Sequence, residues 1–144
     1  LWNGLQRRMH VAYNAFKDFE VPLPSGRSIN YGRVKVTLQN ERRSYVAMVA
    51  KGPKKIPVRL WGGLLAENAS QALARDIFSD MLLRIDEAGI KTIFHVHDEV
   101  VVEEDEDKAE ETLKKIISIM STPPTWIKDI PLEAEGKILT QYEK

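Results

Sequence analysis

Residues 92–102 read TIFHVHDEVVV, a stretch that combines β-branched, apolar and acidic residues. The β-branched and apolar residues at 92–96 and 100–103 predict two short strands. The polar residues His97-Asp98-Glu99 lie between them, so the sequence predicts a tight antiparallel hairpin with these three residues at its tip. Polar side chains at such a junction are costly to bury, and we expect them to be either exposed or functional.

Asp98 and Glu99 at this tip are candidate ligands for a divalent cation. Mg²⁺ prefers hard oxygen ligands, usually one or two carboxylates together with substrate phosphates, so these residues supply half of such a site. If the first strand continues through the tip, Glu99 shares one face with His95 and His97, and Asp98 lies on the other. A zinc pair is another interpretation of the two histidines, but no third nitrogen or thiolate ligand lies at a suitable spacing. The remaining alternative is a polar β-turn without function.

Glycines delimit a long helix on the N-terminal side of this hairpin. Gly62-Gly63 separates the helix from the preceding segment, and Gly89 fits the C′ position after its last turn. Apolar residues recur at helical spacing between these points, and Asp76 interrupts the apolar stripe. The sequence therefore predicts a helix over residues 62–89.

Residues 105–144 follow the hairpin and predict one more helix and a final strand. Asp105 is the expected N-cap, and acidic residues fill the first turn, where the helix dipole favours them. Pro123-Pro124 ends this helix because proline cannot continue it. Residues 131–138 then predict the last strand.

The N-terminal part of the chain divides into a helix and a β-rich segment. Apolar residues between Trp2 and Phe19 recur at spacings of three and four, which predicts one amphipathic helix of about five turns over residues 1–20. The two prolines of the stretch VPLP that follows end this helix. Residues 21–61 contain three strand candidates, at residues 34–38, 45–50 and 56–61. A loop is predicted between the first two, at residues 39–41. Helices and antiparallel hairpins in no strict βαβ order predict an α+β fold, with the hairpins packed against long amphipathic helices.

The composition is that of one globular domain. The chain has 144 residues, of which 43% are apolar and 29% charged, and none is cysteine. The absence of cysteine excludes a disulfide scaffold, a thiolate zinc site, an iron–sulfur cluster and a cysteine nucleophile. No apolar run approaches the roughly 20 residues of a membrane span, so we expect no membrane partner. The chain starts at Leu1 rather than at methionine, and we expect it to be a piece of a longer protein.

Charge is unevenly distributed, although the formal net charge is zero. Residues 25–61 contain nine basic residues and one acidic residue, whereas residues 98–111 contain nine acidic residues and one basic residue. A basic segment favours a polyanionic partner, and an acidic segment favours metal ions or a solvated helix end. The simpler interpretation of each segment is a hydrophilic surface.

The string HVHDEVV at residues 95–101 resembles motif C of the family A, polymerase I-like, DNA polymerases. Further stretches resemble bacteriophage members of this family, and they follow in the same order along the chain. They are PLPSGR at residues 22–27, WGGLLAENASQALARD at 61–76, PPTW at 123–126, PLEAEG at 131–136 and YEK at 142–144. The resemblance covers essentially the whole chain, and its specificity comes from the ordered set rather than from any single motif.

The resemblance implies that the chain is the C-terminal palm segment of a right-handed polymerase. Its parts would be a helix after the fingers (residues 1–20), a basic β-rich segment (21–61), a long helix (62–89), the motif C hairpin (90–104), and a C-terminal helix and strand (105–144). The implied activity is template-dependent nucleotidyl transfer by two metal ions, Mg²⁺ or Mn²⁺. In the family the motif C aspartate, here Asp98, binds both metals, and the adjacent acid, here Glu99, assists.

The resemblance also implies contacts with DNA. His97 matches the histidine that contacts DNA near the primer end, and Gln71 matches the glutamine that reads the minor groove of the new base pair. Glu67 and Gly63 stand where the family has an arginine and an asparagine, and Asn68 would substitute at a shifted position. We further expect phosphate contacts from basic residues of the β-rich segment, namely Arg27, Lys51, Lys54, Lys55 and Arg59.

Motifs A and B of the family, which supply the second metal-binding carboxylate and the triphosphate-binding helix, have no counterpart in this sequence. The expected partners are therefore primer–template DNA, deoxynucleoside triphosphates and an N-terminal remainder that carries both motifs. The expected location is the cytoplasm, which is that of the bacterial host if a phage encodes the protein, and the isolated chain should be inactive. Two alternatives stay open: a catalytically silent, nucleic-acid-binding polymerase relic, and an unrelated metal-dependent phosphohydrolase that uses Asp98, Glu99 and the histidines.

Overall fold

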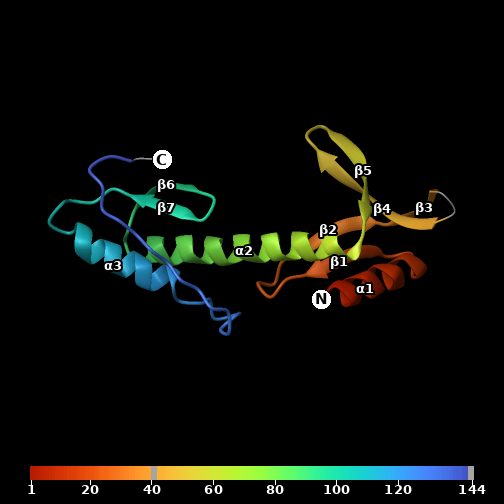
Figure 1. The fold of residues 1–144 in the computed structure, drawn as a ribbon, viewed down its shortest axis with the longest axis horizontal. Coiled ribbons are helices and arrows are strands. Elements are labelled where there is room, and N and C mark those ends of the chain that lie inside the picture. Colours follow the sequence, from red (N-terminus) through yellow and green to blue (C-terminus); the bar gives the residue numbers. More distant parts are fainter. Residues whose placement is uncertain (40–41, 143–144) are drawn as a thin grey trace. The chain divides into compact units, whose positions relative to one another are not determined.

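The computed structural model describes residues 1–39 and 42–142 of the chain, and its helices and antiparallel strands confirm the predicted α+β class (Figure 1). In order, the elements are α1 (Trp2–Asn14), β1 (Asp18–Pro22), β2 (Ser28–Arg33), β3 (Lys35–Gln39), β4 (Arg42–Lys51), β5 (Lys54–Leu60), α2 (Gly62–Glu87), β6 (Thr92–Val96), β7 (Glu99–Val102) and α3 (Ala109–Met120). None of the described helices combines the length and the apolarity needed to span a lipid bilayer.

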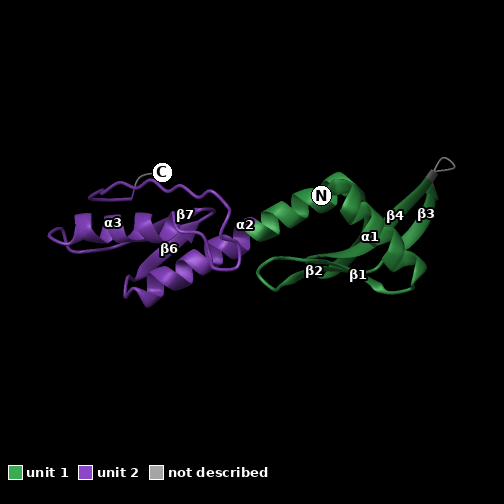
Figure 2. Cartoon of the chain, turned by 90° about the horizontal axis from the view of Figure 1, so that it is seen from below, with its two compact units in different colours: residues 1–73 green, residues 74–144 purple. Residues whose placement is uncertain are grey.

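The chain forms two compact units, residues 1–73 and residues 74–144, and α2 contributes to both (Figure 2). Unit 1 contains the pair β1–β2 and the three-stranded sheet β3–β4–β5, and unit 2 contains the hairpin β6–β7. All of these neighbouring strands are antiparallel. Each described sheet is therefore built from short, local connections, as the spacing of the strand candidates predicts.

The core of unit 1 lies between α1, the strands and the first turns of α2. Leu5 and Met9 of α1 are buried against Phe19, whose ring stacks on Tyr31 at 5.4 Å between centroids. The Asn68 amide of α2 donates a hydrogen bond of 2.9 Å to the Tyr31 hydroxyl, which satisfies a polar group at the edge of this core. In unit 2 the buried residues are mainly on one side of α2, namely Ile77, Phe78, Met81 and Ile85.

The first helix is shorter than predicted, and the expectation of a helix over residues 1–20 is wrong. α1 ends at Asn14, and Phe16 adopts a left-handed conformation with φ of 54°. The amides of Phe16 and Lys17 donate to carbonyls of the last turn, the Schellman arrangement that ends helices. Phe19 then lies in β1, where buried and exposed residues alternate. Its helical spacing from Trp2 is therefore coincidental.

Strands β3, β4 and β5 confirm the three strand candidates of the basic segment, whereas β1 and β2 are additional. The predicted loop at residues 39–41 falls at the gap in the described residues, except that β3 extends to Gln39. The predicted long helix is confirmed as α2, and Gly89 follows it with φ of 76°. The Gly89 and Ile90 amides donate to the Asp86 and Ile85 carbonyls, so glycine occupies the left-handed position for which it is best suited.

Two expectations for the C-terminal part are wrong. Asp105 does not cap α3, because that helix begins at Ala109 with Lys108 as N-cap residue, and the Asp105 carboxylate instead accepts from Lys108 Nζ at 2.9 Å. Residues 131–138 form no strand in the described chain. This segment packs against α3 instead, since a Cβ atom built at Gly136 would lie 2.5 Å from Leu113 Cδ1. Because the segment contacts a helix and has no partner strand, it is not part of any described sheet.

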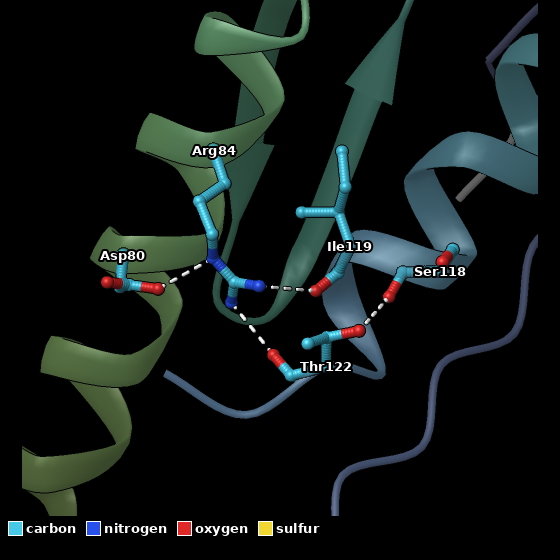
Figure 3. Close-up of polar contacts among 5 residues, drawn as sticks. All are labelled: Asp80, Arg84, Ser118, Ile119 and Thr122. Atoms are coloured by element: carbon cyan, nitrogen blue, oxygen red, sulfur yellow. Dashed lines mark hydrogen bonds and ion pairs between the residues drawn. The ribbon is translucent and has the colours of Figure 1, made fainter. Parts of the chain in front are cut away.

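Arg84 joins α2 to the end of α3 (Figure 3). Its Nε donates to Asp80 Oδ2 at 2.7 Å, and its two terminal nitrogens donate to the carbonyls of Ile119 and Thr122 at 3.1 and 2.9 Å. The last carbonyls of a helix have no partner within the helix, and a cation is favoured there. One partly buried guanidinium therefore holds the two helices of unit 2 together.

Candidate functional site

The β6–β7 hairpin presents Asp98 at a two-residue turn. Val96 and Glu99 are directly paired, so only His97 and Asp98 lie outside the strands. The prediction of a hairpin with Asp98 at its tip is confirmed, but the tip has two residues rather than three, and the second strand is Glu99–Val102 rather than residues 100–103. His97, Asp98 and Glu99 are all exposed. Their side chains are therefore accessible to a ligand.

The turn also corrects the predicted faces of the hairpin. Because the chain reverses after Val96, Glu99 lies on the face of Val96 and Phe94, not on the face of His95. The His95 ring packs edge-to-face against Phe78 of α2, with 5.6 Å between centroids. His95 and Glu99 therefore lie on opposite faces, and the structure does not bring them together with His97 as a ligand set.

His97 is strained at this turn. It has φ of 53°, in the left-handed region that costs most residues other than glycine about 1–2 kcal/mol. Positive φ at the first turn residue, here His97, and not at the second is the pattern of a type II′ turn, in which glycine is the usual first residue. Phe16 takes the same conformation at the end of α1, so the strain by itself assigns no function to His97.

We expect His97→Gly to stabilise unit 2 by about 0.5–1 kcal/mol, because relief of the left-handed strain exceeds the added entropy of the unfolded chain. Phe16→Gly is the matched variant in unit 1, since Phe16 has φ of 54° and its side chain is 75% exposed. Chemical unfolding of the chain would measure both effects. A loss of stability on His97→Gly would show that the imidazole holds the turn together and that the strain argument fails.

The acidic segment around the hairpin does not gather into a metal centre by itself. Across residues 1–39 and 42–142, no three histidine or carboxylate side chains lie close enough together to hold a metal ion. Farther along, Glu110 and Glu111 lie in the first turn of α3, and the hydrogen bond and ion pair with Lys115 lower the pKa of the Glu111 carboxyl. These acids are part of a solvated helix start. Asp98 and Glu99 remain as exposed oxygen donors, which is the donor type that Mg²⁺ takes beside substrate phosphates.

The predicted minor-groove residues lie on α2 in unit 1. Gln71 is exposed, and its amide donates to Glu67 Oε1 at 3.3 Å, a contact that a ligand can replace. Asn68 is held by its hydrogen bond to Tyr31, so its amide already has a structural partner. Gln71 is thus the more accessible of the two. The hairpin that carries Asp98 belongs to unit 2.

Lys51, Lys54 and Lys55 gather at the tip of the β4–β5 hairpin. Gly52-Pro53 forms the turn, with Gly52 at φ of 60°, and Lys51 and Lys54 are paired directly across it. Like charges placed opposite each other on neighbouring strands destabilise a hairpin. Both lysines are exposed, and neither has an acidic partner among the described residues. The tip is therefore suited to a polyanion.

Strand alternation divides these basic side chains between two faces. Lys51 and Lys54 share the face of Val49 and Ile56, whereas Lys55 and Arg59 lie on the opposite face. Arg27 lies apart from this hairpin, in the loop that joins β1 to β2. Of the five basic residues, Lys51, Lys54 and Lys55 thus lie together at the tip, whereas Arg59, which pairs with Val46, and Arg27 lie away from it.

Two features of the structure were not predicted from the sequence. Tyr142 contacts Glu99 and Phe94, although 43 residues separate it from Glu99. A shallow polar hollow of about 290 Å³ lies between α1 and β4, lined by Asn3, Gln6, Arg7, His10 and Tyr45. The His10 ring bonds the Tyr45 hydroxyl and the Asn14 amide there. Neither feature leaves a local pattern in the sequence, because each joins residues from distant segments.

The chain is 41% identical over 128 residues to a protein named DNA polymerase from Bacillus phage SP02. That alignment covers 86% of this chain and 19% of the phage protein, so the chain spans about a fifth of the length of that relative. No family model matches the chain, and no solved structure is significantly similar to it. Over most of its length, the chain is therefore similar to part of a phage DNA polymerase.

Proposed function

We propose that this chain is the C-terminal palm part of a family A, polymerase I-like, DNA-directed DNA polymerase. The observation that carries the proposal is the 41% identity to the SP02 phage DNA polymerase over 86% of the chain. An aspartate at an exposed two-residue turn, directly before a strand that begins with glutamate, supports it. The activity proposed for the complete protein is template-dependent nucleotidyl transfer.

Asp98 is the proposed metal-binding residue of this segment, and Glu99 assists it. Two-metal catalysis places two cations about 3.5–4 Å apart, where they stabilise the attacking and leaving oxygens. Mg²⁺ or Mn²⁺ would be held by Asp98 together with carboxylates from the N-terminal remainder and with substrate phosphates. We propose no metal site made by this chain alone, and the isolated chain should therefore be inactive.

Primer–template DNA is the proposed macromolecular partner, and deoxynucleoside triphosphates are the proposed substrates. His97 and Gln71 are proposed to contact the DNA, and the exposure of both side chains supports this. Asn68 would contribute only if the DNA displaced its bond to Tyr31. The bacterial cytoplasm is the proposed site of action.

The gene itself provides the first test. A reading frame that continues upstream of Leu1 through motifs A and B supports the proposal, whereas a start codon at Leu1 supports the silent relic. The complete protein should then extend a primer on a template in the presence of Mg²⁺. Failure to extend any primer–template would contradict the proposed activity.

We expect removal of the hairpin lysines to weaken the salt dependence of DNA binding. Each neutralised phosphate contributes about −0.9 to the log–log slope of affinity against salt on duplex DNA. Replacing Lys51, Lys54 and Lys55 by alanine in the complete protein should flatten the slope by about one to three units with little change in base preference. A salt titration of primer–template affinity measures this.

The two faces of the hairpin supply a matched pair of variants. If one face meets the DNA, either Lys51→Ala/Lys54→Ala or Lys55→Ala/Arg59→Ala should carry most of the change in slope. Slopes unchanged in both double variants would mean that these side chains only solvate an exposed hairpin.

A further inference from the structure

Tyr142 packs against the face of the β6–β7 hairpin that carries Glu99. Phe94 and Glu99 share this face because the strand register pairs Val96 with Glu99 and Phe94 with Val101. The Tyr142 ring lies edge-to-face on Phe94, with 5.1 Å between centroids and 84° between planes. Its hydroxyl donates a hydrogen bond of 3.5 Å to Glu99 Oε2. One side chain thus contacts both the apolar and the acidic residue of this face.

The segment that brings Tyr142 to the hairpin is itself anchored. After α3 the chain runs back along unit 2 toward β6 and β7 (Figure 1). Gly136 packs against Leu113 so closely that a Cβ atom there would displace the end of the leucine side chain. The opposite face of the hairpin is fixed independently, by the contact between His95 and Phe78 of α2. Tyr142 therefore meets a hairpin that is supported on its other side.

A hydrogen bond to one oxygen of an exposed glutamate restricts the rotamers of that side chain. Glutamate has high side-chain entropy, and a free Glu99 would sample many positions around the turn. Holding Oε2 leaves the second oxygen, Oε1, for a ligand, and Asp98 is the preceding residue in the chain. At 3.5 Å this contact is longer than a charge-assisted hydrogen bond of about 2.5–2.7 Å, so the ring contact with Phe94 holds the phenol in place and the hydroxyl only biases the Glu99 carboxylate.

We propose that Tyr142 is a positioning residue that holds the Glu99 carboxylate in place for the metal-binding aspartate at the turn. This inference rests on the proposed function for its catalytic consequence, but not for the contact itself. Tyr142 touches no substrate in this scheme and acts through Glu99. The apolar contact with Phe94 places the phenol, and the phenol hydroxyl orients the Glu99 carboxylate.

The contact can be tested on this chain without any activity. Tyr142→Phe removes the hydroxyl and retains the ring on Phe94, and Tyr13→Phe is the matched control in unit 1. The side-chain carboxyl carbon of Glu99, observed by NMR, should shift in Tyr142→Phe and not in Tyr13→Phe. An unchanged Glu99 resonance in Tyr142→Phe would overturn the proposal.

The consequence is tested in the complete polymerase. Tyr142→Phe should raise the Mg²⁺ concentration for half-maximal primer extension by about three- to tenfold, the equivalent of one hydrogen bond, with an unchanged KM for nucleotide. The effect should disappear in a Glu99→Ala background, because Glu99→Ala removes the acceptor of the same hydrogen bond. Equal effects of Tyr142→Phe with and without Glu99 would overturn the positioning role. If Asp98→Asn leaves primer extension intact, the proposed function itself fails. The Tyr142 variants test only the positioning role, so the two failures can be distinguished.

Discussion

Asp98→Asn in the complete polymerase is expected to abolish turnover, by about a thousandfold or more, while primer–template binding survives. The substitution keeps the size and shape of the side chain at the two-residue turn and removes the charge that would hold the metals. DNA affinity comes mostly from phosphate contacts elsewhere, so it should change little. Single-turnover primer extension and a binding titration on the same preparation measure the two quantities.

Asp107→Asn is the matched control for this experiment, because Asp107 is an exposed acid of the same segment that lies outside the hairpin. It should leave both turnover and affinity unchanged. Turnover of Asp98→Asn within tenfold of the unmodified protein would contradict the role given to Asp98.

Arg84→Met is expected to destabilise unit 2 by about 2–3 kcal/mol. Methionine keeps much of the packing of the long side chain but loses the ion pair with Asp80 and both hydrogen bonds to the end of α3. The side chains of Arg84 and Asp80 are only 26% and 29% exposed, so solvent replaces these bonds incompletely. Urea unfolding followed by circular dichroism measures the change.

Lys115→Met gives the comparison, because the Lys115–Glu111 pair has a similar separation of 2.7 Å but its side chains are 57% and 72% exposed. Exposed pairs of this kind contribute little to stability, so Lys115→Met should change the free energy of unfolding much less than Arg84→Met does. Equal losses of stability in the two variants would mean that Arg84 acts as an ordinary surface ion pair and that the link between α2 and α3 is not specific.

The sequence predicted those elements that are marked by a terminal glycine or by alternating apolar and polar residues. Gly89 follows α2 as expected, since glycine relieves steric conflict in the left-handed conformation, whereas Gly62 and Gly63 are the first two residues of the helix. The end of α1 could not be predicted in this way, because a phenylalanine occupies the corresponding left-handed position at Phe16. β1 was hidden for a related reason, because the spacing of Phe19 from the residues of α1 also fits a helix.

The last predicted strand failed for a different physical reason. A strand requires a partner edge, and residues 131–138 pack along α3 instead, as the closeness of Gly136 to Leu113 indicates. No pattern within these residues distinguishes the two outcomes, because an extended segment has the same composition in either setting.

At the candidate site, the sequence located the turn but not its register. Asp98 lies at the tip as predicted, but Glu99 belongs to β7, and one residue of register moves a side chain to the opposite face. Tyr142 was beyond prediction, because its contact with Glu99 depends on the path of the chain after α3. The lysine cluster was predicted as a charged segment, and only the pairing of β4 with β5 divides it between two faces.

The central claim is that Asp98 binds catalytic metal in a complete polymerase. Crystals of that protein with primer–template DNA, an unreactive nucleotide and Mn²⁺ would locate the metals by anomalous scattering. We predict a metal peak about 2–2.5 Å from an Asp98 carboxylate oxygen, at the distance typical of hard cations. Metal ions held entirely by other residues, with no peak within coordination distance of Asp98, would contradict the account.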